Sequence, residues 1–63
     1  MRRRELERHL SAHGCRLDRE GAKHAWWVGP KGRSAIPRHR EIKPGTVRAI
    51  CKQLGVREPP SVT

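Results

Sequence analysis

Four apolar residues near the C-terminus recur at the spacing of one helix face. At positions i, i+3, i+4 and i+7 they are Val47, Ile50, Cys51 and Leu54. Pro44 suits the first turn of this helix, and Gly55 suits the residue that follows its end. A helix with a single apolar stripe must bury that stripe against another layer, so the rest of the chain has to supply one.

A second helix is predicted near the N-terminus, over residues 5–13. Leu6 and Leu10 lie four residues apart on one face of it, and Gly14 can end it in the left-handed conformation. This helix also has one narrow apolar stripe, so both helices are expected to pack on the same intervening structure.

Three short strands are predicted between the helices. Residues 15–19 alternate apolar and charged side chains, which is the pattern of a half-buried strand. Residues 25–28 are rich in strand-forming side chains, and residues 33–36 form a third short run. Turns at residues 20–22 and 29–32 would join the three strands into an antiparallel sheet.

The expected fold class is therefore α+β, with a helix, a three-stranded antiparallel sheet and a second helix. Both helices would cover one sheet face, which resembles the double-stranded RNA-binding domain and leaves the other face to solvent or a ligand. We expect one α-β-β-β-α domain over residues 1–56 and a flexible, proline-containing tail over residues 57–63. Only 33% of the 63 residues are apolar, so the core is small and any site should be shallow.

The charge of the chain is strongly positive. Fifteen Lys and Arg residues outnumber six Asp and Glu residues, which gives a net charge of +9. Such a field attracts polyanions and indicates a nucleic-acid partner, although a solvated basic surface or an acidic protein partner would have the same composition. The residues predicted to contact RNA are Arg19, Lys23, Lys31, Arg33, Arg38, His39, Arg40 and Arg48.

Cysteine use and hydropathy point to the cytoplasm. Cys15 and Cys51 form no C-x-x-C motif, and secreted mini-proteins of this size usually have more cysteines. The basic start of the chain is not followed by the apolar segment of a signal peptide, and no apolar run has the length of a membrane span. We expect reduced cysteines and no membrane partner.

The segment Gly21-Ala22-Lys23-His24 lies at the predicted junction between a turn and a strand. An imidazole there would be held by the sheet and still be accessible, and histidine titrates near neutral pH. His24 could then take a proton from a ribose 2′-hydroxyl, with Lys23 contacting phosphate at the rim. A single histidine in this position is also commonly an idle surface side chain.

Three segments of the chain resemble the HicA family of toxins. Residues 21–24 resemble the G-x-x-H or G-S-H segment of that family, and residues 36–39 resemble its P-x-H segment. Residues 44–55 resemble its G-T-(apolar)-R-x-I-x-K-Q-x-G helix. The three segments follow in the family's order and spacing, and the likeness extends over residues 4–56.

The resemblance implies a function. HicA toxins belong to type II toxin–antitoxin systems, cleave mRNA without a metal or other cofactor, and are neutralised by a HicB antitoxin. Their catalytic histidine matches His24, which would act as general base and acid; where many members have Ser before it, this chain has Lys23. We expect the toxin alone to be a monomer that inhibits translation and growth. The alternative is a non-catalytic RNA-binding module with the same fold.

The remaining histidines and the tryptophans have weaker signals. His39 is a candidate second acid, but an ordinary loop histidine is the simpler interpretation. His9 and His13 have a zinc-binding spacing without a full ligand set, so no metal site is predicted. Trp26 and Trp27 are candidates for partner contact. They should face opposite sides of the sheet, so one belongs in the core and the other can meet a base or the antitoxin.

Overall fold

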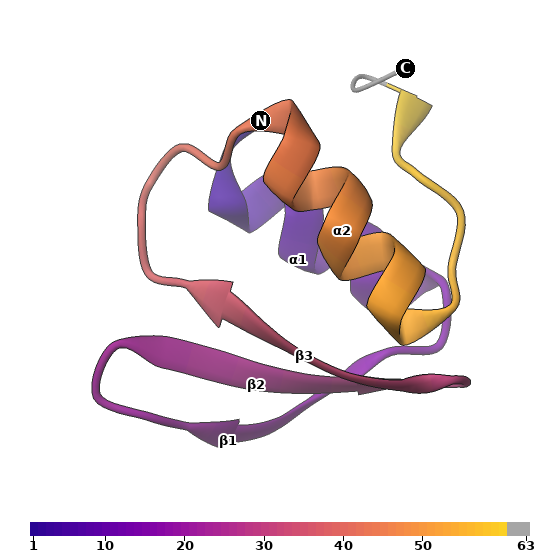
Figure 1. Ribbon diagram of the computed structural model, residues 1–63, viewed down its shortest axis with the longest axis horizontal. Coiled ribbons are helices and arrows are strands. Elements are labelled where there is room, and N and C mark those ends of the chain that lie inside the picture. The colour runs from indigo at the N-terminus through magenta and orange to yellow at the C-terminus, as the bar shows by residue number, and fades with distance from the viewer. Residues whose placement is uncertain (61–63) are drawn as a thin grey trace.

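Both predicted helices and all three predicted strands are present in the computed structural model, which describes residues 1–60. In chain order the elements are α1 (Arg3–Ala12), β1 (Arg16–Glu20), β2 (His24–Gly29), β3 (Gly32–Pro37) and α2 (Pro44–Leu54) (Figure 1). This confirms the α+β fold class and the predicted order of elements. None of the helices in this part of the chain is long and apolar enough to cross a membrane.

The sheet is antiparallel with the strand order β1-β2-β3. β2 and β3 pair in regular register from His24 opposite Pro37 to Gly29 opposite Gly32, so a two-residue turn joins them. The pairing of β1 with β2 shifts register between Leu17 and Arg19, as it does at a β-bulge. Both helices lie on one face of the sheet, and the opposite face, called the open face below, is left uncovered (Figure 1).

Glycines end both helices as predicted. Gly14 and Gly55 have φ values of 84° and 82°, a left-handed conformation that glycine adopts without a steric cost. At the other end of α2, Pro44 occupies the first helical position. These local signals fix where the two helices end and return the chain toward the sheet.

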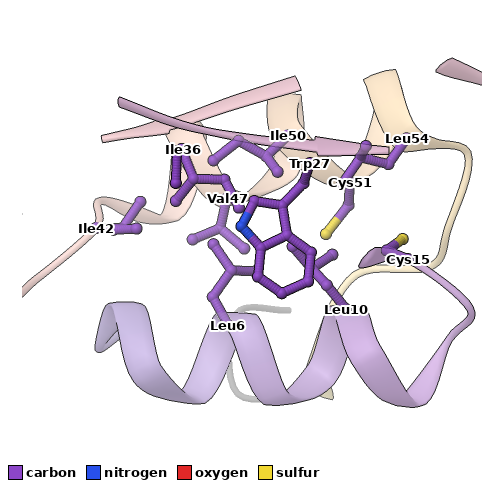
Figure 2. Packing of buried hydrophobic residues seen from close by; sticks show 11 residues of the cluster. Leu6, Leu10, Cys15, Trp27, Ile36, Ile42, Val47, Ile50, Cys51 and Leu54 are labelled. Atoms are coloured by element: carbon purple, nitrogen blue, oxygen red, sulfur yellow. The ribbon is translucent and has the colours of Figure 1, made fainter. Parts of the chain in front are cut away.

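The core lies between the sheet and the two helices. Leu6 and Leu10 of α1, together with Val47 and Leu54 of α2, are fully buried. Trp27 projects from β2 toward the two leucines of α1 (Figure 2) and is 6% exposed. The two apolar stripes therefore meet over one sheet face, as their spacing predicts.

Both cysteines are buried and free. Desolvation by burial raises the pKa of the Cys15 thiol and is also the main cause of the raised pKa of Cys51, to which the negative charge of Glu58 adds. These thiols act as small apolar groups of the core.

The half-buried pattern predicted for residues 15–19 is confirmed at Cys15, which is buried, and is wrong at Leu17. All residues of β1 are exposed, and Leu17 retains 45% of its accessible surface although it pairs with Trp27. The reason is the position of α2, which packs on β3 and β2, whereas β1 lies at the opposite edge of the sheet.

Both ends of the described chain contact the domain. The backbone N–H of Arg3 donates to the carbonyl of Arg40, and the N–H of Ile42 donates to the carbonyl of Met1, at 2.8 and 2.7 Å. After α2, the side chain of Pro59 is buried, beyond the boundary that the sequence suggested at residue 56. The flexibility of 57–63 stays a prediction, and residues 61–63 lie outside the described part.

Candidate functional site

His24 is the first residue of β2 and its side chain is exposed. The next residue, Ala25, is buried, and successive strand side chains point to opposite faces. The imidazole of His24 therefore lies on the open face, away from the helices. Within residues 1–60 no side-chain hydrogen bond or ion pair engages the ring. Both ring nitrogens are therefore available to a ligand that approaches this face.

The turn before His24 depends on a close approach by Gly21. The N–H of Gly21 donates to the carbonyl of His24 at 2.8 Å, which closes the turn. A Cβ on Gly21 would lie 3.0 Å from that carbonyl oxygen and 3.9 Å from Nε1 of Trp26. The glycine is thus required for space, because its φ is not in the left-handed region.

Lys23 lies within this turn, not in the strand. The alternation of strand side chains therefore does not govern its direction relative to His24. Its side chain is exposed, and its contact with phosphate stays a prediction.

Arg38 braces the same turn from the other side. Its guanidinium donates to the carbonyl of Gly21 at 2.9 Å and lies 3.3 Å from a carboxylate oxygen of Glu20. Because Arg38 directly follows Pro37, the strand partner of His24, it is a positive charge close to the His24 turn. The sequence predicts Arg38 as a phosphate contact, whereas its part in holding the turn depends on strand pairing, which no local pattern shows.

Trp26 shares the open face with His24, two residues further along β2, and is half-buried. The guanidinium carbon of Arg33 lies 5.7 Å from the centroid of the Trp26 ring. Arg33 is also ion-paired with Asp18 of β1 at 2.6 Å, across the width of the sheet. The open face therefore presents an aromatic ring two residues from His24, with a positioned cation beside that ring that comes from the residue opposite Val28, and both suit a nucleotide.

The two tryptophans lie on opposite faces, as strand alternation predicts. Trp27 is the core residue, so its prediction as a partner contact is wrong: a side chain that is 6% exposed offers no surface to another molecule. Its Nε1–H has no hydrogen-bond acceptor among residues 1–60. Trp26 stays the candidate for partner contact.

The remaining predicted RNA contacts are spread over several parts of the surface. Arg19 pairs with Trp26 on the open face. Lys31 lies in the β2–β3 turn at the end of the sheet away from His24, and its side chain packs against Gly55. Arg48 belongs to α2 and is 3.2 Å from Glu58, so it lies in the helix layer.

Two other predicted residues follow β3. His39 and Arg40 are both exposed in the loop that leads to α2. His39 comes two residues after the strand partner of His24, which places it at the same end of the sheet. Its role stays a prediction.

His9 and His13 are engaged within the protein. Their ring centroids are 4.1 Å apart; Nε2 of His9 donates to the Arg57 carbonyl at 2.8 Å, and Nδ1 of His13 donates to the His9 carbonyl at 2.9 Å. Among the described residues, no three His, Cys, Asp or Glu side chains are grouped so as to hold a metal ion.

Comparison with known proteins shows that the chain matches one protein family. The sequence model of a family described as "HicA toxin of bacterial toxin-antitoxin" matches residues 3–56, which is most of the chain. No curated protein and no solved structure matches this chain. The matched range runs from the first residue of α1 to the residue after Gly55, and so contains both helices and the whole sheet.

Proposed function

This chain belongs to the HicA toxin family of bacterial toxin–antitoxin systems, and we propose that it acts as an mRNA endoribonuclease with His24 as its catalytic residue. The observation that supports this most directly is the exposed imidazole at the start of β2, with no partner inside the described protein. The alternative, a non-catalytic RNA-binding module, would not require such a histidine beside the glycine turn.

The proposed reaction uses the RNA itself as the nucleophile. His24 takes the proton of a ribose 2′-hydroxyl, and the oxygen then attacks the adjacent phosphorus. The bond from phosphorus to the 5′-oxygen of the next nucleotide breaks, which gives a 2′,3′-cyclic phosphate and a 5′-hydroxyl after the proton is returned. A positioned general base accounts for about 10² to 10⁴ in rate.

The open face would hold the substrate. Trp26 can stack on a base next to the cleaved bond, since stacking on an aromatic ring tolerates any sequence. Arg33 is held near Trp26 by its ion pair with Asp18, so its position is fixed before RNA arrives. The exposed Lys23, next to His24 in the chain, would stabilise charge on the phosphoryl oxygens in the transition state. Arg33, which lies opposite Val28, would contact a phosphate further along the strand.

The proposed partners follow from the same face. A HicB-type antitoxin would neutralise the toxin by laying acidic or apolar surface over His24 and Trp26, which would block RNA. We propose that the free toxin is a cytoplasmic monomer.

The test is RNA cleavage by the wild type and His24→Ala, without added metal. We expect His24→Ala to lose cleavage, to keep RNA binding, and to unfold at nearly the same temperature, because an exposed side chain contributes little to the core. His13→Ala is the matched control and should cleave like the wild type, because His13 is an exposed histidine at the end of α1 and is not among the predicted RNA contacts. Full cleavage by His24→Ala would refute the mechanism, and RNA binding by a wild type that never cleaves would indicate the binding module.

A further inference from the structure

A shallow hollow between α1 and the loop after β3 is lined almost entirely by arginine. The arginines are Arg2, Arg3, Arg4, Arg8, Arg38 and Arg40. The one acidic residue in its lining is Glu5. We call this feature the arginine hollow; four of its arginines come from the N-terminal segment and α1 and were not predicted as RNA contacts.

Backbone pairing brings the two sides of the arginine hollow together. The N–H of Arg3 donates to the carbonyl of Arg40 at 2.8 Å, and Arg2 forms a β-bridge with Glu41. The start of α1 and the loop are far apart in sequence, so the concentration of charge is a product of the fold.

Only half of these arginines have an internal counter-charge. Arg2, Arg3 and Arg38 each lie 3.3 to 3.9 Å from a carboxylate, namely those of Glu41, Glu7 and Glu20. In contrast, Arg4, Arg8 and Arg40 are exposed, with no carboxylate within 4.0 Å in residues 1–60. Three uncompensated guanidinium groups around one hollow repel each other unless an anion lies between them, and their planar forks suit phosphate.

The arginine hollow lies close to the proposed active site. Arg38, at its edge, donates to the carbonyl of Gly21 in the turn that leads to His24. The β1–β2 turn and the loop from β3 to α2 are at the same end of the molecule (Figure 1). A nucleic-acid strand that leaves the open face past this turn would meet the hollow directly.

We propose that the arginine hollow binds backbone phosphates of the RNA strand whose cleaved bond lies at His24. This rests on the proposed function, and adds a second anchoring site to it. RNA fits better than an acidic protein segment, because the lining has no apolar or aromatic side chain. Protein interfaces usually need such an anchor, whereas phosphate binding needs only charge.

The first test measures salt dependence of binding to a single-stranded RNA in the His24→Ala background. The hollow variant carries R4Q, R8Q and R40Q; the control carries K43Q, K52Q and R57Q, which removes the same charge from other exposed positions. Each lost phosphate contact lowers the slope of log affinity against log salt by about 0.7 for single strands. We expect the hollow variant to lose about 2 units of slope by that relation and the control to lose much less.

The second test uses cleavage of two substrates with His24 intact. A dinucleotide is too short to reach the arginine hollow, so the hollow variant should cleave it like the wild type. For a longer RNA, the same variant should show a raised KM with kcat unchanged. Circular dichroism should show that both variants are folded.

Three outcomes would overturn the inference. One is an equal loss of slope in the hollow and control variants, and another is an equal rise in KM for both substrate lengths. The third is a loss of antitoxin binding with an unchanged RNA slope, which would assign the hollow to the protein partner. Failure of the proposed function would be seen separately, because the wild type would then not cleave RNA. A smaller slope of log affinity against log salt in the hollow variant would still support phosphate binding in that case.

Discussion

Gly29 is predicted to be a position where even one methyl group destabilises the fold. It is the last residue of β2 and lies directly against the end of α2. In Gly29→Ala, the new Cβ would lie 2.5 Å from the backbone oxygen of Leu54 and 2.8 Å from the Cβ of that residue. The same oxygen accepts a hydrogen bond from the N–H of Lys31 at 3.1 Å, so it has little freedom to move. Overpacking of this kind costs about 1–3 kcal/mol.

The measurement is the free energy of unfolding and the Tm, followed by circular dichroism. For a domain of this size each kcal/mol corresponds to about 4–8 °C in Tm, so Gly29→Ala should melt at least about 4 °C below the wild type.

Gly45→Ala is the matched control for this prediction. No atom lies within 4 Å of its added Cβ, and Gly45 is in the first turn of α2 without a left-handed φ. It should be neutral or stabilising, since Gly in a helix costs about 0.5–1 kcal/mol relative to Ala. A Gly29→Ala protein that melts at or above the wild-type temperature would refute the packing argument.

Three further predictions concern other parts of the molecule. Ser34→Ala removes the 2.6 Å hydrogen bond to Oε1 of Gln53 and should cost about 0.5–1.5 kcal/mol in urea unfolding; an unchanged midpoint would contradict this. Trp26→Ala in the His24→Ala background should weaken RNA binding by about 5- to 150-fold, the equivalent of about 1–3 kcal/mol per stacked base, while Trp26→Phe should keep most of it; equal affinity of all three proteins in fluorescence anisotropy would rule out stacking. Because burial raises the pKa of Cys15 and Cys51 above the unfolded value, the unfolded chain loses its thiol protons first, and stability should fall as the pH rises above about 8.5. A double Cys→Ala variant should show a flatter stability profile from pH 8 to 10, and an identical slope would count against this origin.

The elements of the fold follow from local signals in the sequence. The helix stripes, the left-handed glycines and Pro44 depend only on neighbours in the chain, and the structure has them where the pattern predicts. The burial of β1 was mispredicted because an alternating pattern shows which side chains share a face, and not whether any helix covers that face. Leu17 illustrates the difference, since it has the position of a core residue at an uncovered edge.

The candidate site likewise has some features that local sequence patterns predict and others that depend on contacts between distant residues. Strand alternation predicted that one tryptophan would be buried, and register decided that it is Trp27. By contrast, the arginine hollow depends on pairing between residues 1–3 and 40–42, which no local pattern encodes. The run of three arginines at residues 2–4 was the available signal, but the sequence alone did not indicate what they would face.

The structure separates the residues that stabilise the fold from those proposed to act on RNA. Gly29 and Ser34 lie on the side of the sheet that packs against α2, whereas His24 and the unpaired arginines are exposed. Substitutions of the second group should therefore change cleavage or affinity with little change in Tm, and those of the first group should do the opposite. In a domain this small the buried residues have little room for any task except packing, so its function must be carried by surface groups and by the field they create.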